Sequence, residues 1–274
     1  MADKERIIAQ MKTLPKRIIV ILLAIYAGFG LFLYFNQRAM LYYPDNQDFE
    51  DCPGFVDYQK LNHKGTRFYL KEKTKNKIVV YYHGNAGSAC DRSFVRTTFE
   101  QQSVSVMFVE YAGFANDDKK PSKNLILKDV ENMVDYIEEK GYEKIIVYGQ
   151  SIGSGAASYH AKIGQVDTLI LATAFSSTED VVRARFGIYP VSLMLRETYD
   201  NVAWLGNYSN KLVILHGDKD TIVPPRFSRK LFESTHTKDK QYHLIEGAGH
   251  NTVWEFPEFR DIIMRAIILD ETFL

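Results

Sequence analysis

The strongest constraint on the fold is a repeated alternation of short apolar runs with helix-periodic segments. The apolar runs lie at 54–61, 66–71, 78–83, 104–111, 144–149, 168–174, 211–217 and 241–247. Solid apolar strands separated by helices are typical of a parallel sheet that helices cover on both faces. The first two runs alternate more and stand close together, so we expect them to pair antiparallel at one edge.

The segment 122–141 shows the helical period most clearly. Gly141 is expected to end this helix. Its apolar residues fall near one face: Leu125, Leu127, Val130, Met133, Val134 and Ile137. The alternation is interrupted at 174–210, where we expect a small helical cap. Because no repeat or linker is evident, residues 39–274 are expected to form one α/β domain.

An uncharged run of 18 residues, 18–35, precedes this domain. As a helix it would be about 27 Å long, close to the ~30 Å hydrocarbon core of a bilayer. A signal peptide would have a shorter apolar stretch that ends in a small-residue cleavage site, whereas this run ends in Tyr34-Phe35-Asn36-Gln37-Arg38. We therefore expect an uncleaved transmembrane anchor over 18–38.

Basic residues flank the apolar run unequally. Arg38 alone follows it before Lys60. Five precede it: Lys4, Arg6, Lys12, Lys16 and Arg17. The positive-inside rule then predicts a single-pass membrane protein with residues 1–17 in the cytoplasm and the domain on the non-cytoplasmic side. In an oxidising compartment Cys52 and Cys90 are able to pair, although nothing in the sequence requires that bond.

Charge and spacing exclude several classes of partner. The 34 basic and 34 acidic residues balance to zero net charge, so no basic field is present for nucleic acid. No group of histidine, cysteine and acidic residues has metal-ligand spacing. The glycines after residue 150 lack the third glycine and the ribose-binding acid of a dinucleotide site. We expect no nucleic-acid partner, no cofactor and no metal.

Four predicted strands end in loops that combine glycine with a polar or ionisable residue. These loops are HGNAGSAC, GQSIGSG, HGDKDTIVPP and GAGHN. Because the carboxyl ends of parallel strands lie along one edge, where ligands bind in such sheets, the loops should meet. They contribute Ser151, Asp220 and His250, in that chain order.

Each of these residues has a chemical part to play. A G-x-S-x-G turn exposes a serine hydroxyl between strand and helix, which makes Ser151 a candidate nucleophile. His250 would be its base, and Asp220 would orient the imidazole. The backbone N–H of Ile152 and that of Asn85 or Ala86 would bind an oxyanion.

Several neighbours compete for these roles. Asp218 is the rival acid, although its position in the turn suits backbone capping. His83 and His216 are expected to be structural. Cys90 is either a reactive thiol or, as we favour, a small residue that lines the core.

These segments resemble the α/β-hydrolases, and among them a branch of membrane-anchored serine hydrolases whose oxyanion loop has the sequence HGNAG. Beside that loop, QRAMLYYP, YGQSIGSGAA, VSLMLRETYDN, LVILHGDKDTIVP and EGAGHN carry the resemblance, which covers nearly everything after the apolar run. It implies the α/β-hydrolase fold, with Ser151 as nucleophile, Asp220 as acid and His250 as base. It also implies removal of acyl groups from esters or thioesters, with lipid-like molecules or lipidated proteins as substrates. Ala112 and Lys123 depart from the family's arginine and glutamate, which leaves the shape of the substrate open.

Two other functions stay open. The same triad cleaves amides, so a serine peptidase or amidase is the alternative within the enzymes. A non-catalytic, membrane-tethered binding module is the alternative from another class, although all three triad positions are kept. The aromatic and basic residues of 183–199 either line an acyl pocket or pack a cap, and Arg183, Arg185 and Arg196 are expected on solvated surface.

Overall fold

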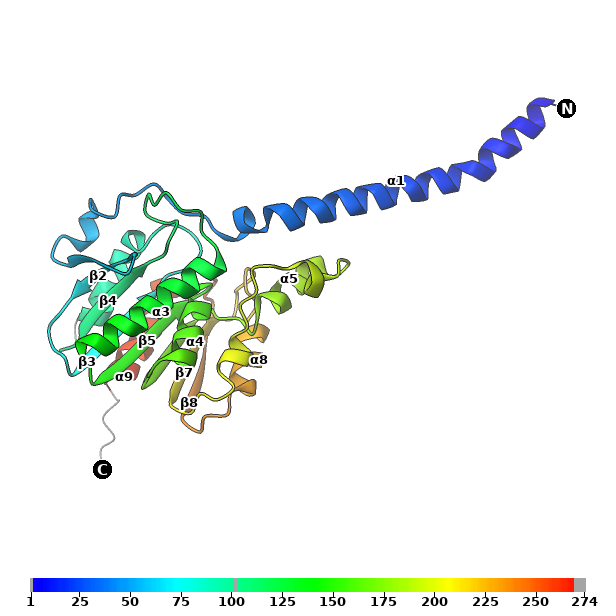
Figure 1. Cartoon of the computed structure of the whole chain (residues 1–274). Coiled ribbons are helices and arrows are strands. Elements are labelled where there is room, and N and C mark those ends of the chain that lie inside the picture. Colours follow the sequence, from blue (N-terminus) through cyan, green and yellow to red (C-terminus); the bar gives the residue numbers. More distant parts are fainter. Residues whose placement is uncertain (1, 101–102, 269–274) are drawn as a thin grey trace.

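One twisted sheet organises the domain in the computed structural model, which describes residues 2–100 and 103–268 (Figure 1). Residue 1 of the predicted cytoplasmic segment, and 269–274 at the end of the predicted domain, lie outside the described residues. In the described ranges the sheet has eight strands, in the order β1-β2-β4-β3-β5-β6-β7-β8. Their bounds are β1 Gln59–His63, β2 Thr66–Lys71, β3 Lys77–Tyr82, β4 Ser105–Glu110, β5 Lys144–Gln150, β6 Thr168–Ala172, β7 Lys211–Gly217 and β8 Lys240–Ile245.

The predicted mostly parallel sheet is confirmed. Strand β1 pairs antiparallel with β2 at one edge, and β2 pairs antiparallel with β4. The pairs from β4 through β3, β5, β6 and β7 to β8 are parallel. The first predicted strand, 54–61, begins too early, because η1 (Pro53–Phe55) precedes β1. Phe55 is fully buried against the rings of Tyr69 and Phe108. This stretch is therefore apolar because it packs in the core, although it does not pair in the sheet.

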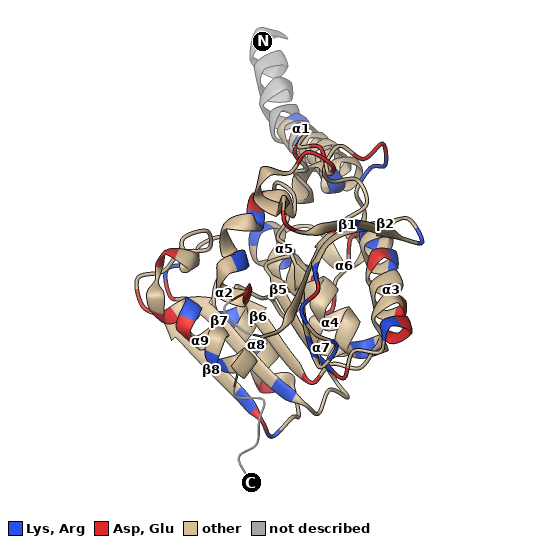
Figure 2. Ribbon diagram, turned by 90° about the vertical axis from the view of Figure 1, so that its left-hand side faces the viewer, with Lys and Arg blue, Asp and Glu red and all other residues tan. Residues whose placement is uncertain are grey.

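Helices cover both faces of the sheet. Helices α3 (Lys123–Lys140), α4 (Gly153–Ile163) and α8 (Arg226–Ser234) pack on one face, and α2 (Arg96–Glu100) and α9 (Pro257–Ile268) pack on the other. Side chains of β3 alternate between the two cores, as the period of a strand requires: Val80 enters the first and Val79 the second. Figure 2 shows basic and acidic residues interspersed over the outer helices, most clearly on α3.

Helix α3 begins and ends with strong caps. The hydroxyl of Ser122 accepts from the N–H of Leu125, and Gly141 ends the helix in the left-handed region with φ +66°. Its buried stripe includes Ile126 rather than the predicted Leu125, because Ile126 is one helical turn from Val130.

The segment predicted as a cap contains three short helices between β6 and β7. These are α5 (Thr178–Phe186), α6 (Val191–Met194) and α7 (Asn201–Trp204). Helix α5 lies beside the long N-terminal helix (Figure 1), whereas α7 packs against α4, where Asn201 donates to Ser154.

That N-terminal helix, α1 (Ala2–Leu41), projects from the domain as a rod (Figure 1). In the part of the chain that the structure describes, Lys16–Leu41 is the one helical stretch long and apolar enough to cross a membrane. It contains the predicted anchor, 18–38. The apolar side chains from Ile18 to Ile25 are largely exposed, which sets this helix apart from a core helix.

A disulfide joins the segment after α1 to the domain. Cys52 lies between α1 and β1, and Cys90 begins η2 (Cys90–Val95), with 5.8 Å between their Cα atoms. Cys90 is therefore not a reactive thiol; it is buried in the core, as we favoured, and is joined there to Cys52.

Candidate active site

Ser151 occupies a strained turn between β5 and α4. Its φ is +53°, a left-handed conformation that costs a residue with a side chain of order 1 kcal/mol or more. The turn is held on both sides: the N–H of Ser151 donates to the carbonyl of Ala172 at 2.9 Å, and its carbonyl accepts from Ser154 at 2.9 Å. The strain is therefore maintained by the sheet and the following helix.

The two glycines of the motif allow this turn by close approach. A Cβ at Gly149 would lie 2.6 Å from the Cβ of Ala157 on α4. A Cβ at Gly153 would overlap the carbonyls of Tyr82 and His83 at the end of β3. Because real carbon atoms do not approach so closely, α4 can start directly behind the serine only with glycine at both positions.

The three predicted triad residues meet at the carboxyl ends of β5, β7 and β8. Nε2 of His250 lies 2.9 Å from Oγ of Ser151, and Nδ1 of His250 lies 2.7 Å from Oδ2 of Asp220. His250 and Asp220 are buried, and Ser151 is partly exposed. With Nδ1 protonated, His250 donates to Asp220 and accepts from the serine hydroxyl.

Asp220 is held as a carboxylate. Burial would raise its pKa, but hydrogen bonds from His216 and His250, the charge of His250 and the N–H of Val223 hold the pKa below its usual range. The other oxygen, Oδ1, accepts from the backbone of Ile222 at 2.9 Å and of Val223 at 2.8 Å. The carboxylate therefore has fixed donors on both oxygens.

His216 is a partner of the site that the sequence reasoning left among the structural histidines. Its Nε2 lies 3.0 Å from Oδ2 of Asp220 and 2.7 Å from the carbonyl of Val223. Its buried Nδ1 meets no hydrogen-bond partner within the described residues, so a neutral ring protonated at Nε2 satisfies both acceptors. The spacing of four residues between His216 and Asp220 in HGDKD was the available signal.

The other competing residues have structural contacts. Oδ1 of Asp218 accepts from the N–H of Gly247 at 2.7 Å, which joins the β7 loop to the β8 loop without touching His250. His83 is fully buried, bonded to the carbonyl of Gly84 and 3.4 Å from Glu110. Oε2 of Glu110 accepts from the N–H of Ala89, so this pair supports the HGNAG loop from behind.

The predicted oxyanion groups surround the serine. Asn85, Ala86 and Ile152 all line the cavity that contains Ser151. Among the described residues, no acceptor receives a hydrogen bond from the backbone N–H of Asn85, Ala86 or Ile152. The loop is braced by Tyr43, whose N–H donates to Asn85 and whose carbonyl accepts from Gly87, each at 2.9 Å. The side-chain amide of Asn85 also donates to the carbonyl of Leu41 at 3.0 Å.

A cavity of about 650 Å³ opens at Ser151. Helix α1 contributes one wall and the cap the other. The α1 side includes Leu33, Tyr34, Gln37, Met40 and Leu41, and the cap side includes Val181, Phe186, Tyr189, Val191, Met194 and Leu195. The aromatic and apolar residues of 183–199 thus line the pocket and also pack the cap. Ala112 and Lys123 do not line it.

Glu197 fastens α1 to the cap, a role that the sequence did not indicate. Its oxygens accept from Arg38 at 2.7 Å, from the Tyr42 hydroxyl at 2.9 Å and from the backbone of Lys123 at 2.6 Å. Burial would raise the pKa of Glu197, but these donors outweigh it and hold the pKa below its usual range. A buried carboxylate therefore joins the exit of α1, the cap and the start of α3.

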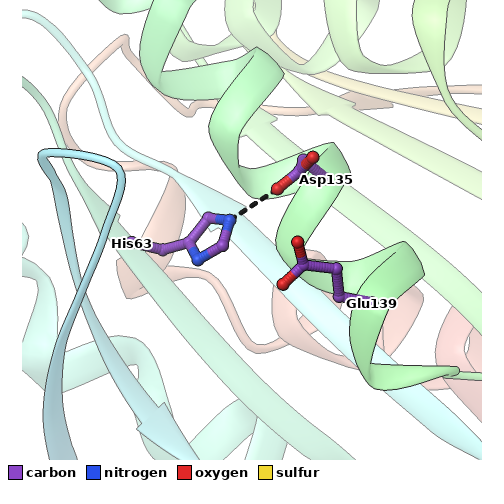
Figure 3. Close-up of side chains that lie close together, drawn as sticks. All are labelled: His63, Asp135 and Glu139. Carbon is purple, nitrogen blue, oxygen red and sulfur yellow. Dashed lines mark hydrogen bonds and ion pairs between the residues drawn. The ribbon is translucent and has the colours of Figure 1, made fainter.

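A second cluster of ionisable side chains lies far from this cavity. His63 is the last residue of β1, and Asp135 and Glu139 lie one turn apart on α3 (Figure 3). Nε2 of His63 lies 2.6 Å from Oδ2 of Asp135, and the ammonium of Lys64 lies 2.6 Å from the same oxygen. Because Lys64 already supplies a positive charge there, the cluster is a surface ion-pair network.

Comparisons with known proteins agree with this architecture. A family described as "Alpha/beta hydrolase of unknown function" matches residues 69–176, and one described as "Serine aminopeptidase, S33" matches residues 191–256. The chain is 25% identical to an uncharacterized membrane protein, YNL320W, of Saccharomyces cerevisiae over 75% of each chain. It is 28% identical to protein bem46 of Schizosaccharomyces pombe over 63% of this chain and 61% of that one.

A solved structure shares the fold. The esterase Pf2001 of Pyrococcus furiosus superposes with a TM-score of 0.64 at 14% identity, over 82% of this chain and 97% of the esterase. Taken with the strand order and the two family matches, this likeness shows that the chain has the α/β-hydrolase fold.

Proposed function

We propose that this chain is a membrane-anchored serine hydrolase that cleaves acyl esters or thioesters through an acyl-enzyme. The observation that carries the proposal is the continuous contact from Ser151 to His250 at 2.9 Å and from His250 to Asp220 at 2.7 Å. Such a relay is what a neutral hydroxyl needs to become a nucleophile.

In the acylation step, Oγ of Ser151 attacks the acyl carbon while its proton passes to Nε2 of His250. Asp220, kept ionised by its donors, stabilises the imidazolium that forms. The tetrahedral intermediate collapses, the bond to the alcohol or thiol breaks, and the leaving group takes the proton from His250. In deacylation, His250 removes a proton from water, which attacks the acyl-serine and releases a carboxylic acid.

Charge on the substrate oxygen develops beside the free backbone donors. The N–H of Ile152 stands behind the nucleophile, and that of Asn85 or Ala86 lies on the facing loop. Losing one such donor typically raises the barrier by about 2.7–4 kcal/mol.

The cavity favours an acyl chain over a peptide. An aminopeptidase needs a free carboxylate to bind the substrate's α-amino group, and Glu197 is the carboxylate that lines this cavity. Its oxygens are already occupied by Arg38, Tyr42 and Lys123. The remaining walls are mainly apolar, as an acyl chain requires. The name of the Pyrococcus esterase points in the same direction.

We further propose that α1 anchors the chain and that the domain lies on the non-cytoplasmic side. The apolar Lys16–Leu41 stretch and the likeness to a yeast membrane protein support anchoring. The Cys52–Cys90 pair suits an oxidising compartment, and Asn207 of the Asn207-Tyr208-Ser209 acceptor triplet is exposed. Expression in a glycosylating cell should add a glycan that the Asn207→Gln variant lacks. If the wild type carries no glycan and a reporter after the domain is active in the cytoplasm, the orientation is wrong.

Labelling with a fluorophosphonate probe tests the enzyme itself. The folded wild type should be labelled covalently, and the Ser151→Ala variant should not. Equal labelling of both, or none of either, would favour the binding module. A panel of p-nitrophenyl esters, acyl thioesters and aminoacyl amides then separates esterase from peptidase, and faster cleavage of the amides would contradict our proposal.

A further inference from the structure

The tip of the cap rests against the middle of the apolar stretch of α1. The rings of Tyr26 and Tyr189 stack with 4.4 Å between their centroids. The hydroxyl of Tyr26 donates to the carbonyl of Ile188 at 2.7 Å, and that of Tyr189 donates to the carbonyl of Tyr26 at 3.1 Å. Tyr26 lies near the centre of the uncharged run 18–35. A helix that spans a bilayer therefore takes the cap tip into the hydrocarbon with it.

The chemistry of the tip suits that position. Residues 186–195, which we call the cap tip, carry no charged side chain. The side chain of Leu193 is 84% exposed and that of Ile188 is 76% exposed. Two large apolar side chains facing outward beside an apolar helix form a surface that water does not favour.

Many backbone groups of the cap tip are bonded within the protein, which lowers the free-energy cost of placing them in lipid. Within the tip, the N–H groups of Tyr189, Val191, Leu193, Met194 and Leu195 donate to nearby carbonyls. Gln37 of α1 donates to the carbonyl of Met194 at 3.2 Å. In hydrocarbon an unsatisfied backbone group costs several kcal/mol, so this irregular segment can enter the leaflet only when it is bonded in this way.

The catalytic cavity continues into the same region. A second hollow of about 530 Å³ lies between α1 and the cap tip, lined by Tyr26, Gly30 and Pro190 among others. It shares Tyr34, Tyr189 and Met194 with the cavity at Ser151. The two hollows therefore adjoin at these three residues, and both lie against the apolar helix.

We propose that the cap tip is inserted in the membrane and that the path between it and α1 admits the acyl chain of a membrane lipid ester directly from the leaflet. This inference rests on the proposed hydrolase function and names its substrate class. The acyl chain would lie against Tyr34, Tyr189 and Met194, which line both hollows, while its ester reaches Ser151 at the domain end. Arg185 and Arg196 flank the cap tip in the sequence, so each end of this uncharged segment carries a basic side chain of the kind that anionic lipid phosphates attract.

Insertion is tested without activity. The full chain is reconstituted in phosphatidylcholine vesicles whose acyl chains carry bromine, and the fluorescence of Leu193→Trp is compared with that of Val56→Trp. Val56 is 77% exposed and directly follows η1, between α1 and β1 and outside the cap. The added fluorescence at 193 should be quenched and that at 56 should not, above the shared background of Trp204 and Trp254. Equal quenching, or none at 193, overturns the insertion.

The path is tested with a pair of glycines on α1. A Cβ at Gly30 would lie 2.9 Å from the ring of Tyr189, whereas a Cβ at Gly28 meets nothing within 4 Å. Gly30→Leu should lower hydrolysis of 4-methylumbelliferyl oleate in those vesicles by about fivefold or more. Its hydrolysis of water-soluble p-nitrophenyl acetate should stay within a factor of about two, as should both activities of Gly28→Leu.

The outcomes separate the two proposals. Equal losses on oleate and acetate with Gly30→Leu, or no loss on either, contradict the path. Absence of fluorophosphonate labelling at Ser151 contradicts the hydrolase, while quenching at 193 would still establish insertion of the cap tip.

Discussion

The backbone of Tyr43 pairs with Asn85, whose carbonyl accepts from the Tyr43 N–H at 2.9 Å. Tyr43 follows the last residues of α1, and Asn85 belongs to the loop that faces Ser151. The exit of the apolar helix is therefore built into the wall of the candidate active site. Helix α1 and the candidate site are one structural unit rather than two parts joined by a linker.

Loss of the Asn85 side chain should slow catalysis. Asn85→Ala keeps the backbone N–H but removes the amide that donates to the carbonyl of Leu41. Because a typical hydrogen bond contributes about 1 kcal/mol, kcat on a soluble ester should fall about fivefold with little change in KM. Gln47→Ala is the control, since its amide serves only the nearby carbonyls of Asp48 and Asp51. An unchanged kcat would show that the loop is held without this bond.

The two aspartates of the β7 loop should differ sharply. Asp220→Asn should keep the fold intact but removes the negative charge beside His250. The kcat should therefore fall by a factor of roughly 10³–10⁴. Asp218→Asn keeps an acceptor for the N–H of Gly247 and should retain most activity. Steady-state rates on a p-nitrophenyl ester measure both. Equal damage by the two changes would contradict the assignment of Asp220.

Lowering the pH should stabilise the domain through protonation of Asp129. This carboxylate is buried between the hydroxyl of Thr66 and the N–H of Ala112, and burial raises its pKa to about 6. Between its ordinary value of about 3.9 and 6, the folded state binds more protons than the unfolded state. The stability that this group contributes is therefore fully present below about pH 4 and is lost as the pH rises through 6. The loss in the free energy of unfolding is on the order of 3 kcal/mol.

The measurement is the melting temperature at several pH values from 4 to 7.5. Asp129→Asn should flatten the slope in this window. Glu138→Gln, an exposed change on the same helix, should leave the slope as in the wild type. A wild-type profile without a fall between pH 4 and pH 7 would argue against a raised pKa.

Removing the disulfide should destabilise the domain. Cys52 and Cys90 are 38 residues apart. Closing a loop of that length lowers the entropy of the unfolded chain, which raises the free energy of unfolding by about 4 kcal/mol at 25 °C. The Cys52→Ser, Cys90→Ser double variant should unfold at lower denaturant than the oxidised wild type. A reducing agent should lower the midpoint of the wild type and leave that of the variant in place. A midpoint that neither change moves would mean the bridge constrains nothing.

Local sequence determined the parts of this protein that depend on neighbouring residues. Solid apolar runs, the Ser122 and Gly141 caps and the G-x-S-x-G turn are set by strand burial, capping and close approach, all within a few positions. The order of the four glycine loops placed Ser151, Asp220 and His250 at one edge, because parallel strands share the direction of their ends. The predicted start of the first strand, residue 54, was too early, because Phe55 belongs to η1 and is buried in the core before β1 begins.

Only the tertiary structure decided what surrounds those residues. That His216 is a second donor to Asp220, that Glu197 binds Arg38 and Tyr42, and that Tyr26 stacks on Tyr189 all depend on elements remote in the chain. The separation between Tyr26 and Ile188, which share a hydrogen bond, is 162 residues. No local period encodes such a contact, because it forms only when the cap folds back over the carboxyl ends of the strands and meets the apolar helix α1. The shape of the cavity is set by that meeting.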